Sequence, residues 1–211
     1  MEPAEQIAEA RAKSGGERRS EERFDDFVAI IIAVMAMLLA ITSLGGGNAA
    51  EDIANHNIHA SDTWAFYQAK TIRQTTMRVT ADELEAQLKA NPAMTAEARD
   101  YIRSKIDEYR KTAERYDSEP DKDDPDNPLK GEGRKQLTAR ARDYEARREA
   151  AQLKDPNFDF AEALFQIAIV LASVSILANS RKLLFVAVAV GVAATSLMLN
   201  GYFLFLPGLF D

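Results

Sequence analysis

The chain has two histidines, His56 and His59, which lie about one helical turn apart. Asp52 and Asp62 stand within about a turn on either side, so side chains that ligate metals such as zinc are clustered in the sequence. Side chains on one helix diverge by about 100° per residue, so another helix or subunit would have to complete such a site. These four residues are weak metal candidates. Exposed polar residues or a pH-sensitive contact are the alternatives, and we expect no cofactor.

An acidic segment, residues 117–131, offers a second set of possible ligands, in this case for calcium. Asp117, Glu119 and Asp121 occupy alternate positions, as in a calcium-binding loop. Lys122, however, replaces the glycine that an EF-hand requires, and no glutamate occupies the twelfth position. Prolines and repelling carboxylates cannot bury a core, so the segment predicts an exposed loop.

Aromatic and charged side chains are also concentrated in residues 61–74. The members of this group that we single out are Trp64, Phe66, Tyr67, Gln68, Lys70 and Arg73. Residues two apart do not share a helical face, so the group must serve two surfaces. Large aromatics at helical spacing mostly supply buried area, which predicts an interface within a bundle or between subunits. If Trp64 is fully buried, replacing it with alanine would cost about 3–5 kcal/mol.

Within this group, Trp-Ala-Phe-Tyr-Gln-Ala-Lys at residues 64–70 resembles a signature of small bacterial membrane proteins, the uncharacterised family "domain of unknown function 4337". The order of a polar tail, one span, this helix, a charged middle and a closing pair of spans also resembles that family, so the resemblance covers nearly the whole chain. The match is not complete, because Ser61 and Thr63 stand where the family pattern would have other polar residues. The resemblance implies membrane residence but no reaction or ligand.

Three long apolar runs flank the charged middle, and each approaches the roughly 20 residues that a helix needs to cross a bilayer. Their interiors lack ionisable side chains, which argues against an ion-coupled transporter. Gly191, Thr195 and Asn200 are the candidates for helix packing inside the membrane. A cleaved signal peptide is the alternative for the first run, but that run exceeds the usual apolar region of about 7–15 residues.

We therefore predict an all-α integral membrane protein with one N-terminal transmembrane helix, a C-terminal transmembrane hairpin and a coiled-coil-like helical domain between them. The predicted segments are a polar tail (1–26), the spans 27–44, 160–178 and 183–206, and the extramembrane domain 45–159.

The extramembrane domain should contain three helices. The first carries Ile53, Ala60, Tyr67 and Gln74 at seven-residue spacing, could restart at a Thr80–Glu83 capping box, and ends at Asn91-Pro92. The second begins near Thr95. The third starts around Leu137 and is stopped by Asp155-Pro156.

The connections in this domain carry two further expectations. Gly45-Gly46-Gly47 permits a hinge after the first span. Three upright helices need an extra return path to the membrane, and the acidic loop is long enough to run the full height of the domain. The alternative is that the helices lie along the membrane.

Lysine and arginine near the membrane set orientation. They occur in the tail and in the short turn between the last two spans, at Arg11, Lys13, Arg18, Arg19, Arg23, Arg181 and Lys182. The N-terminus should therefore be cytoplasmic, with the central domain and the C-terminus outside a bacterial inner membrane.

The charge balance bears on partners. With 33 acidic against 26 basic residues and a net charge of −7, the chain lacks the basic excess that nucleic acids attract. It has no cysteine, which excludes disulfides and thiolate chemistry. In the absence of a catalytic signature, we expect a non-enzymatic, self-associating scaffold or partner-binding module in the bilayer. An oligomeric channel or transport accessory, and a metal-dependent sensor or enzyme using His56 and His59, are the alternatives.

Overall fold

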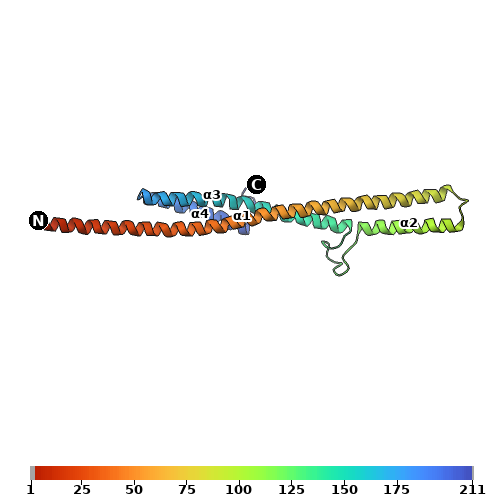
Figure 1. Ribbon diagram of the computed structural model, residues 1–211, viewed down its shortest axis with the longest axis horizontal. Helices are drawn as coiled ribbons and strands as arrows, with labels where there is room; N and C mark the ends of the chain where they lie inside the picture. The colour runs from red at the N-terminus through yellow and green to blue at the C-terminus, as the bar shows by residue number, and fades with distance from the viewer. Residues whose placement is uncertain (1–2, 211) are drawn as a thin grey trace. The chain divides into compact units, whose positions relative to one another are not determined.

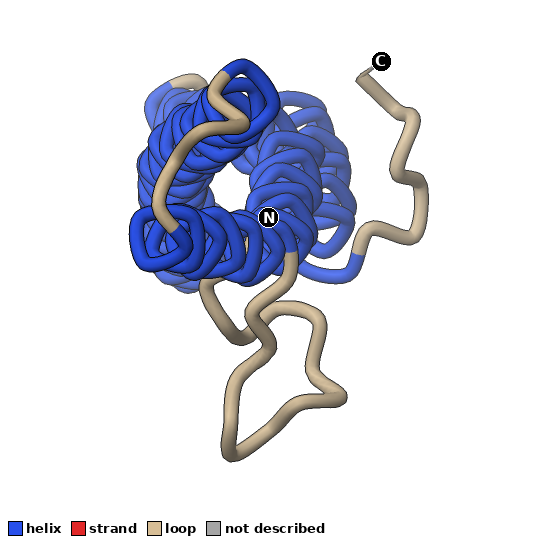
Figure 2. Tube along the Cα trace, turned by 90° about the vertical axis from the view of Figure 1, so that its right-hand side faces the viewer, coloured by secondary structure: helices blue, strands red, loops and turns tan. Residues whose placement is uncertain are grey.

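The computed structural model describes the backbone of residues 3–210 and the side chains of residues 22–210, and over that range all regular structure is helical (Figures 1 and 2). The helices are α1 (Pro3–Ala90), α2 (Ala96–Asp117), α3 (Arg134–Leu177) and α4 (Arg181–Phe203). Helices α1, α3 and α4 each contain a segment long and apolar enough to cross a membrane. The predicted all-α fold is confirmed. The side chains of Arg11, Lys13, Arg18 and Arg19 lie outside the described residues.

The chain forms two compact units. The apolar unit comprises residues 1–51 and 150–211, and the charged unit comprises residues 52–149. These boundaries fall inside the predicted 45–159 domain because both of its ends pack in the apolar unit. Phe158, for example, lies against Gly201 of α4.

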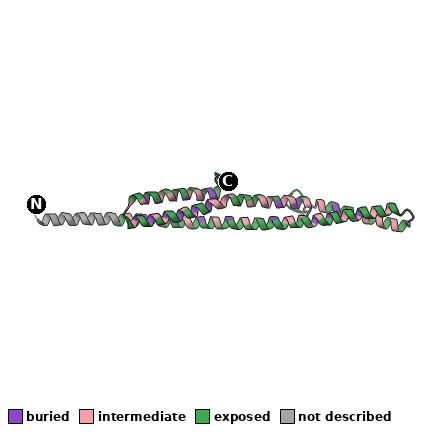
Figure 3. Ribbon diagram, turned by 90° about the horizontal axis from the view of Figure 1, so that it is seen from above, coloured by how far each residue is buried: buried purple, intermediate pink, exposed green. Residues whose placement is uncertain are grey.

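The buried residues of the apolar unit follow the spacing of packed helices. In α1 they recur every seventh residue, at Val28, Met35, Thr42 and Ala49. In α4 they alternate three and four residues apart, at Leu184, Ala187, Gly191, Ala194, Met198 and Gly201, with Asn200 buried in addition. Many of the outward side chains are large and apolar, among them Phe27, Ile30 and Val170. Exposed positions alternate with buried ones along the helices in Figure 3. Small residues inside and large apolar residues outside are the pattern of helices that pack within lipid.

Two predicted interruptions are wrong. Helix α3 continues through Pro156, and α1 continues through Gly45-Gly46-Gly47. Proline removes one backbone N–H from the helix. The next residue, Asn157, adds a side-chain bond in the same turn, donating from Nδ2 to the carbonyl of Leu153 at 2.9 Å. Gly45 and Gly46 serve a close approach instead of a hinge, because a Cβ at Gly45 would lie 2.5 Å from Cε1 of Phe158 and one at Gly46 would lie 3.3 Å from its Cβ.

In the charged unit, α1 runs antiparallel to α2 and to the start of α3. Gln74 of α1 contacts the last turns of α2 through the carbonyl of Ala113, and further back along α1 Trp64 contacts Glu145 of α3. Helices α2 and α3 thus follow one another along α1, and of the two arrangements left open by the sequence, the one with three upright passes is wrong. The loop does not span the unit either, since the N–H of Glu132 donates to the carbonyl of Glu119 at 2.9 Å and closes it at its base.

The predicted helix ends vary in accuracy. Helix α1 ends at Ala90, directly before Asn91-Pro92, and Thr95 caps α2 by accepting a bond from the N–H of Ala98 at 3.3 Å. Both predictions are confirmed. The capping box at Thr80 and Glu83 restarts nothing, because α1 is already helical there.

Candidate functional site

The aromatic and charged group on α1 serves two faces, as predicted. Trp64 and Tyr67 are half-buried and Lys70 is buried, and all three point toward other parts of the charged unit. Phe66, Gln68 and Arg73 are exposed.

Lys70 is a cation enclosed within the charged unit, with 3% of its surface exposed. Its Nζ donates to Oε2 of Glu119 at 3.0 Å and lies 3.5 Å from Oε2 of Glu132. The same ammonium lies 5.5 Å from the ring centre of Phe66 and 5.4 Å from that of Tyr116, so aromatic faces and carboxylates surround it. Because Glu119 and Glu132 also form the base of the loop, Lys70 fastens both ends of the loop to α1.

Gln74 lies one turn further along α1 and ties α2 to α3. It is 2% exposed, and its Nε2 donates to the carbonyl of Ala113 at 2.9 Å. Its Oε1 accepts a bond from Nη1 of Arg134, whose Nη2 donates to the hydroxyl of Tyr67 at 2.8 Å. The guanidinium of Arg134 also lies 5.0 Å from the centre of the Tyr67 ring. The end of α2 and the start of α3 are thereby held at one level of α1.

We call Tyr67, Lys70, Gln74, Glu119 and Arg134 the polar network. Tyr67 and Lys70 were among the predicted interface residues, whereas Gln74 and Arg134 were missed as site residues. Gln74 does belong to the seven-residue stripe that includes Ala60 and Tyr67, and a long amide in an inward stripe signals a bond to a buried backbone group.

The acidic loop uses several of its carboxylates within its own turns. Oδ1 of Asp121 accepts bonds from the N–H groups of Asp123 and Asp124. A hydrogen bond from Lys130, at 2.9 Å, lowers the pKa of Asp124. Gly131 has a φ of 99°, and a Cβ there would lie only 2.3 Å from the carbonyl oxygen of Glu119. The turns of this loop therefore rest on its own carboxylates and on a glycine at its base.

The histidines pack on an aromatic ring. The ring centres of His59 and His56 lie 5.1 and 6.1 Å from that of Tyr144, both stacked. Asp52 and Asp62 lie exposed on α1. Over the described part of the chain, no three His, Asp or Glu side chains are placed to hold a metal ion. The structure thus does not bring the four weak metal candidates together into a site.

Trp64 is half-buried, donates from Nε1 to Oε1 of Glu145 at 2.8 Å and meets the Tyr67 ring edge-to-face. Because its surface is only partly removed from water, Trp64→Ala should lower the free energy of unfolding by about 2 kcal/mol, less than for a fully buried ring. Urea unfolding of the full chain in detergent measures this loss. Phe66→Ala removes a more exposed ring and should cost clearly less; an equal loss for both would contradict the packing role of Trp64.

The polar groups predicted for the membrane segments make bonds inside the apolar unit. Asn200 donates from Nδ2 to Oδ1 of Asn157 at 2.7 Å, and its Oδ1 accepts the N–H of Leu206 at 2.8 Å. It therefore bridges α4 to α3 and holds the chain after α4, which ends at Phe203, before the predicted 206. Thr195 bonds back to the carbonyl of Gly191 within α4.

Gly191 is a point of close approach. A Cβ on this residue would lie 2.7 Å from Cε of Met35. The small-residue face of α4 is therefore filled by a side chain of α1 from the same chain.

Aromatic rings gather near the C-terminal end of α4. The rings of Phe158 and Tyr202 meet edge-to-face, those of Phe160 and Phe210 stack at 4.8 Å, and the hydroxyl of Tyr202 donates to the carbonyl of Ile41 at 3.0 Å. Such rings are typical of the level where a membrane meets water.

Asp155 lies just before these rings. Burial, with a smaller contribution from Asp159, raises its pKa above the usual range. A carboxyl with a raised folded pKa costs stability where it is charged, and the cost disappears as the pH falls through that pKa. We expect Asp155→Asn to stabilise the apolar unit near neutral pH and to flatten its gain on acidification, as thermal unfolding in detergent at several pH values would show. An unchanged pH profile would contradict this role; Asp126→Asn, in the exposed loop, is the control.

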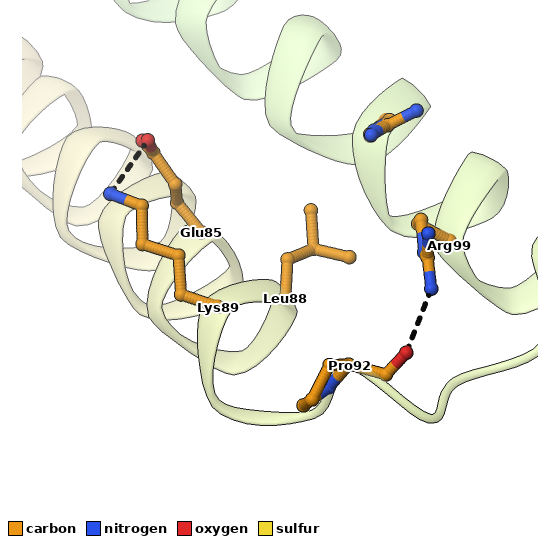
Figure 4. A pocket seen from close by; sticks show the side chains of 6 residues that line it. Glu85, Leu88, Lys89, Pro92 and Arg99 are labelled. Atoms are coloured by element: carbon orange, nitrogen blue, oxygen red, sulfur yellow. Dashed lines mark hydrogen bonds and ion pairs between the residues drawn. The ribbon is translucent and has the colours of Figure 1, made fainter.

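A shallow pocket of about 410 Å³ lies where α1 turns into α2 (Figure 4). Its lining residues are Glu85, Leu88, Lys89, Pro92, Arg99 and Arg103. Arg99 donates to the carbonyl of Pro92 at 3.0 Å, and hydrogen bonds from Lys89 and Arg110 lower the pKa of Glu85. Of the lining cations, Arg99 holds the turn, whereas Lys89 and Arg103 pair with carboxylates on their own helices.

Fold and site together define an all-helical protein that joins three helices long and apolar enough to cross a membrane to a charged helical unit. A family model described as a domain of unknown function (DUF4337) matches residues 24–204, and the chain belongs to that family. None of the curated proteins and none of the solved structures matches it.

Proposed function

We propose that this chain is a non-enzymatic, oligomeric membrane protein whose charged unit serves as a scaffold or partner-binding module. The polar network is the observation that carries the proposal. The buried cation and amide of the signature helix, which could otherwise do chemistry, bond to α2, α3 and the loop of their own unit. Their role is to hold a helical bundle in one shape.

The apolar unit supports anchoring over transport. Its bonded asparagine pair, Asn157 and Asn200, joins α3 to α4, and the Gly191 face is covered by Met35. These residues spend their polar groups and their small-residue face on packing between helices of one chain, which favours the scaffold over the channel alternative.

The orientation that we propose places the N-terminus in the cytoplasm and the charged unit and the C-terminus outside the bacterial inner membrane. Basic residues at Arg23, Arg181 and Lys182 mark the cytoplasmic ends of the spans, and the aromatic rings around Phe158 and Tyr202 mark the opposite ends. The charged unit is then a coiled-coil-like bundle in the extracytoplasmic space.

Reporter fusions test the orientation. A phosphatase fused at Asp126, within the exposed loop, should be active outside the cytoplasm, and the same reporter fused before Arg23 should be inactive. A phosphatase that is inactive at Asp126 and active before Arg23 would overturn the topology.

Reconstitution tests the scaffold role. Purified full-length protein should run larger than one 23.4 kDa chain and carry no current in planar bilayers. Conductance that scales with protein concentration would favour the channel alternative, and a strict monomer in native membranes would overturn the oligomer.

A further inference from the structure

A second apolar stripe runs along α1 in the charged unit, on the side facing away from α2 and α3. Its members recur every seventh residue: Ile58, Ala65, Ile72 and Val79. Ile58 is 55% exposed, Ile72 67% and Val79 49%, and Ala65 is also exposed.

The stripe is opposite to the face that packs within the unit. Each member stands two positions before a residue of the inward stripe, which consists of Ala60, Tyr67, Gln74 and Ala81. Two positions on a helix correspond to about 200°, so the two stripes lie on opposite sides of α1. The outer stripe is left without a partner among the described residues.

Seven-residue spacing is the pattern by which two parallel helices pair, each residue meeting its own copy. Three of the four members, Ile58, Ile72 and Val79, are β-branched, the residue type found at the first heptad position of two-stranded parallel pairs, although the leucine that usually accompanies it at the fourth position is not present. Copies anchored in one membrane with one orientation meet in parallel, so the anchor imposes the register that this stripe requires.

Charges beside the stripe fit the same pairing. Arg78 and Glu83 are both exposed and make no ion pair within the described part of their own chain. With the stripe at the first heptad position, they occupy the two flanking positions that meet across a parallel pair, five residues apart. Each Arg78 would therefore face Glu83 of the other copy.

We propose that the outer stripe is a self-association surface, on which a second copy of this chain docks in parallel and in register. The proposal rests on the oligomeric function proposed above and assigns it a surface. The positions between the stripe residues include Ser61, Gln68 and Thr75, which are polar, so the pairing alone is weak. Confinement to a membrane raises the effective concentration of the second copy and offsets that weakness.

The absence of cysteine makes the surface testable in the full chain. Single cysteines at Ala65, Ile72 and Val79 would each face their own copy with Cα atoms roughly 6 Å apart, within disulfide range. Matched controls are single cysteines at Phe66, Arg73 and Thr80, one position further along the same helix. In oxidised membranes of the expression host, we expect about tenfold more covalent dimer at each stripe position than at its control, because disulfide geometry is restrictive.

Each result decides something. The proposal is supported if dimers form at the three stripe positions and not at the controls, and if Ile72→Asp reduces dimer formation by the cysteines at Ala65 and Val79. Similar cross-linking at both sets, or at neither, overturns it. If the uncross-linked protein is still oligomeric in native membranes, only the surface fails; if it is monomeric, the proposed oligomer fails too. Protection of the cysteine at position 72 from a water-soluble maleimide without any dimer would mean that lipid covers the stripe, which also overturns the proposal.

Discussion

Replacing Phe158 with alanine is expected to lower the free energy of unfolding of the apolar unit by about 3–5 kcal/mol, because it removes a buried ring from a fitted site. Phe158 is 3% exposed. Its ring occupies the space where a Cβ on Gly45 or Gly201 would stand, at 2.5 and 2.9 Å respectively, and it packs on Tyr202. Denaturation of the full chain in mixed detergent micelles, followed by circular dichroism, measures the loss.

Phe160→Ala is the matched control. That ring is 51% exposed and stacks on Phe210, so its removal should cost much less. Gly201→Ala approaches the same site from the other side and should also destabilise, by about 1–3 kcal/mol through overpacking. If Phe158→Ala unfolds like the wild type, the packing of Phe158 against Gly45 and Gly201 does not hold α1, α3 and α4 together.

Lys70→Met is expected to destabilise the charged unit by about 1.5–3 kcal/mol, the range for losing a hydrogen bond to a charged group. Methionine keeps an apolar stem beside Phe66 and Tyr116 but cannot bond to Glu119 or Glu132. With the base of the loop released, residues 118–133 should be cleaved faster in limited proteolysis of the full chain.

Lys89→Met serves as the comparison for this change. The Lys89 side chain is 75% exposed and pairs with Glu85 on the same helix, so its loss should leave the cleavage rate unchanged. Equal protection of the loop in the Lys70 and Lys89 variants would show that the loop is held by its own turns alone.

Periodicity predicted much of this fold because burial follows it closely. Hydrophobic periodicity predicts which face of a helix is apolar. It predicted the spans, the start of α2, the end of α1 and the inward stripe through Ala60 and Gln74. Family membership was also predictable, because the Trp64–Lys70 signature is contiguous.

The wrong predictions share a physical cause. Pro156 and the three glycines were taken as breaks from local propensity, which tertiary packing overrides. At Gly45 and Gly46 the side chain of Phe158 fills the space that glycine leaves. Of the polar network, Tyr67 and Lys70 were predicted as interface residues, whereas Gln74 and Arg134 were missed. Arg134 bonds to Gln74 and Tyr67, which precede it by 60 and 67 positions, and no local sequence pattern predicts such a distant partner.

The closed base of the loop has a consequence for how this region can change. Because Glu119 and Glu132 meet through a backbone bond, the intervening residues begin and end at nearly the same point. Lengthening a loop whose ends are already together adds little entropic cost, about 0.6 kcal/mol per doubling. Insertions and deletions at its tip should therefore accumulate without disturbing the helices, which makes this loop a permissive place to graft an epitope or a whole folded domain.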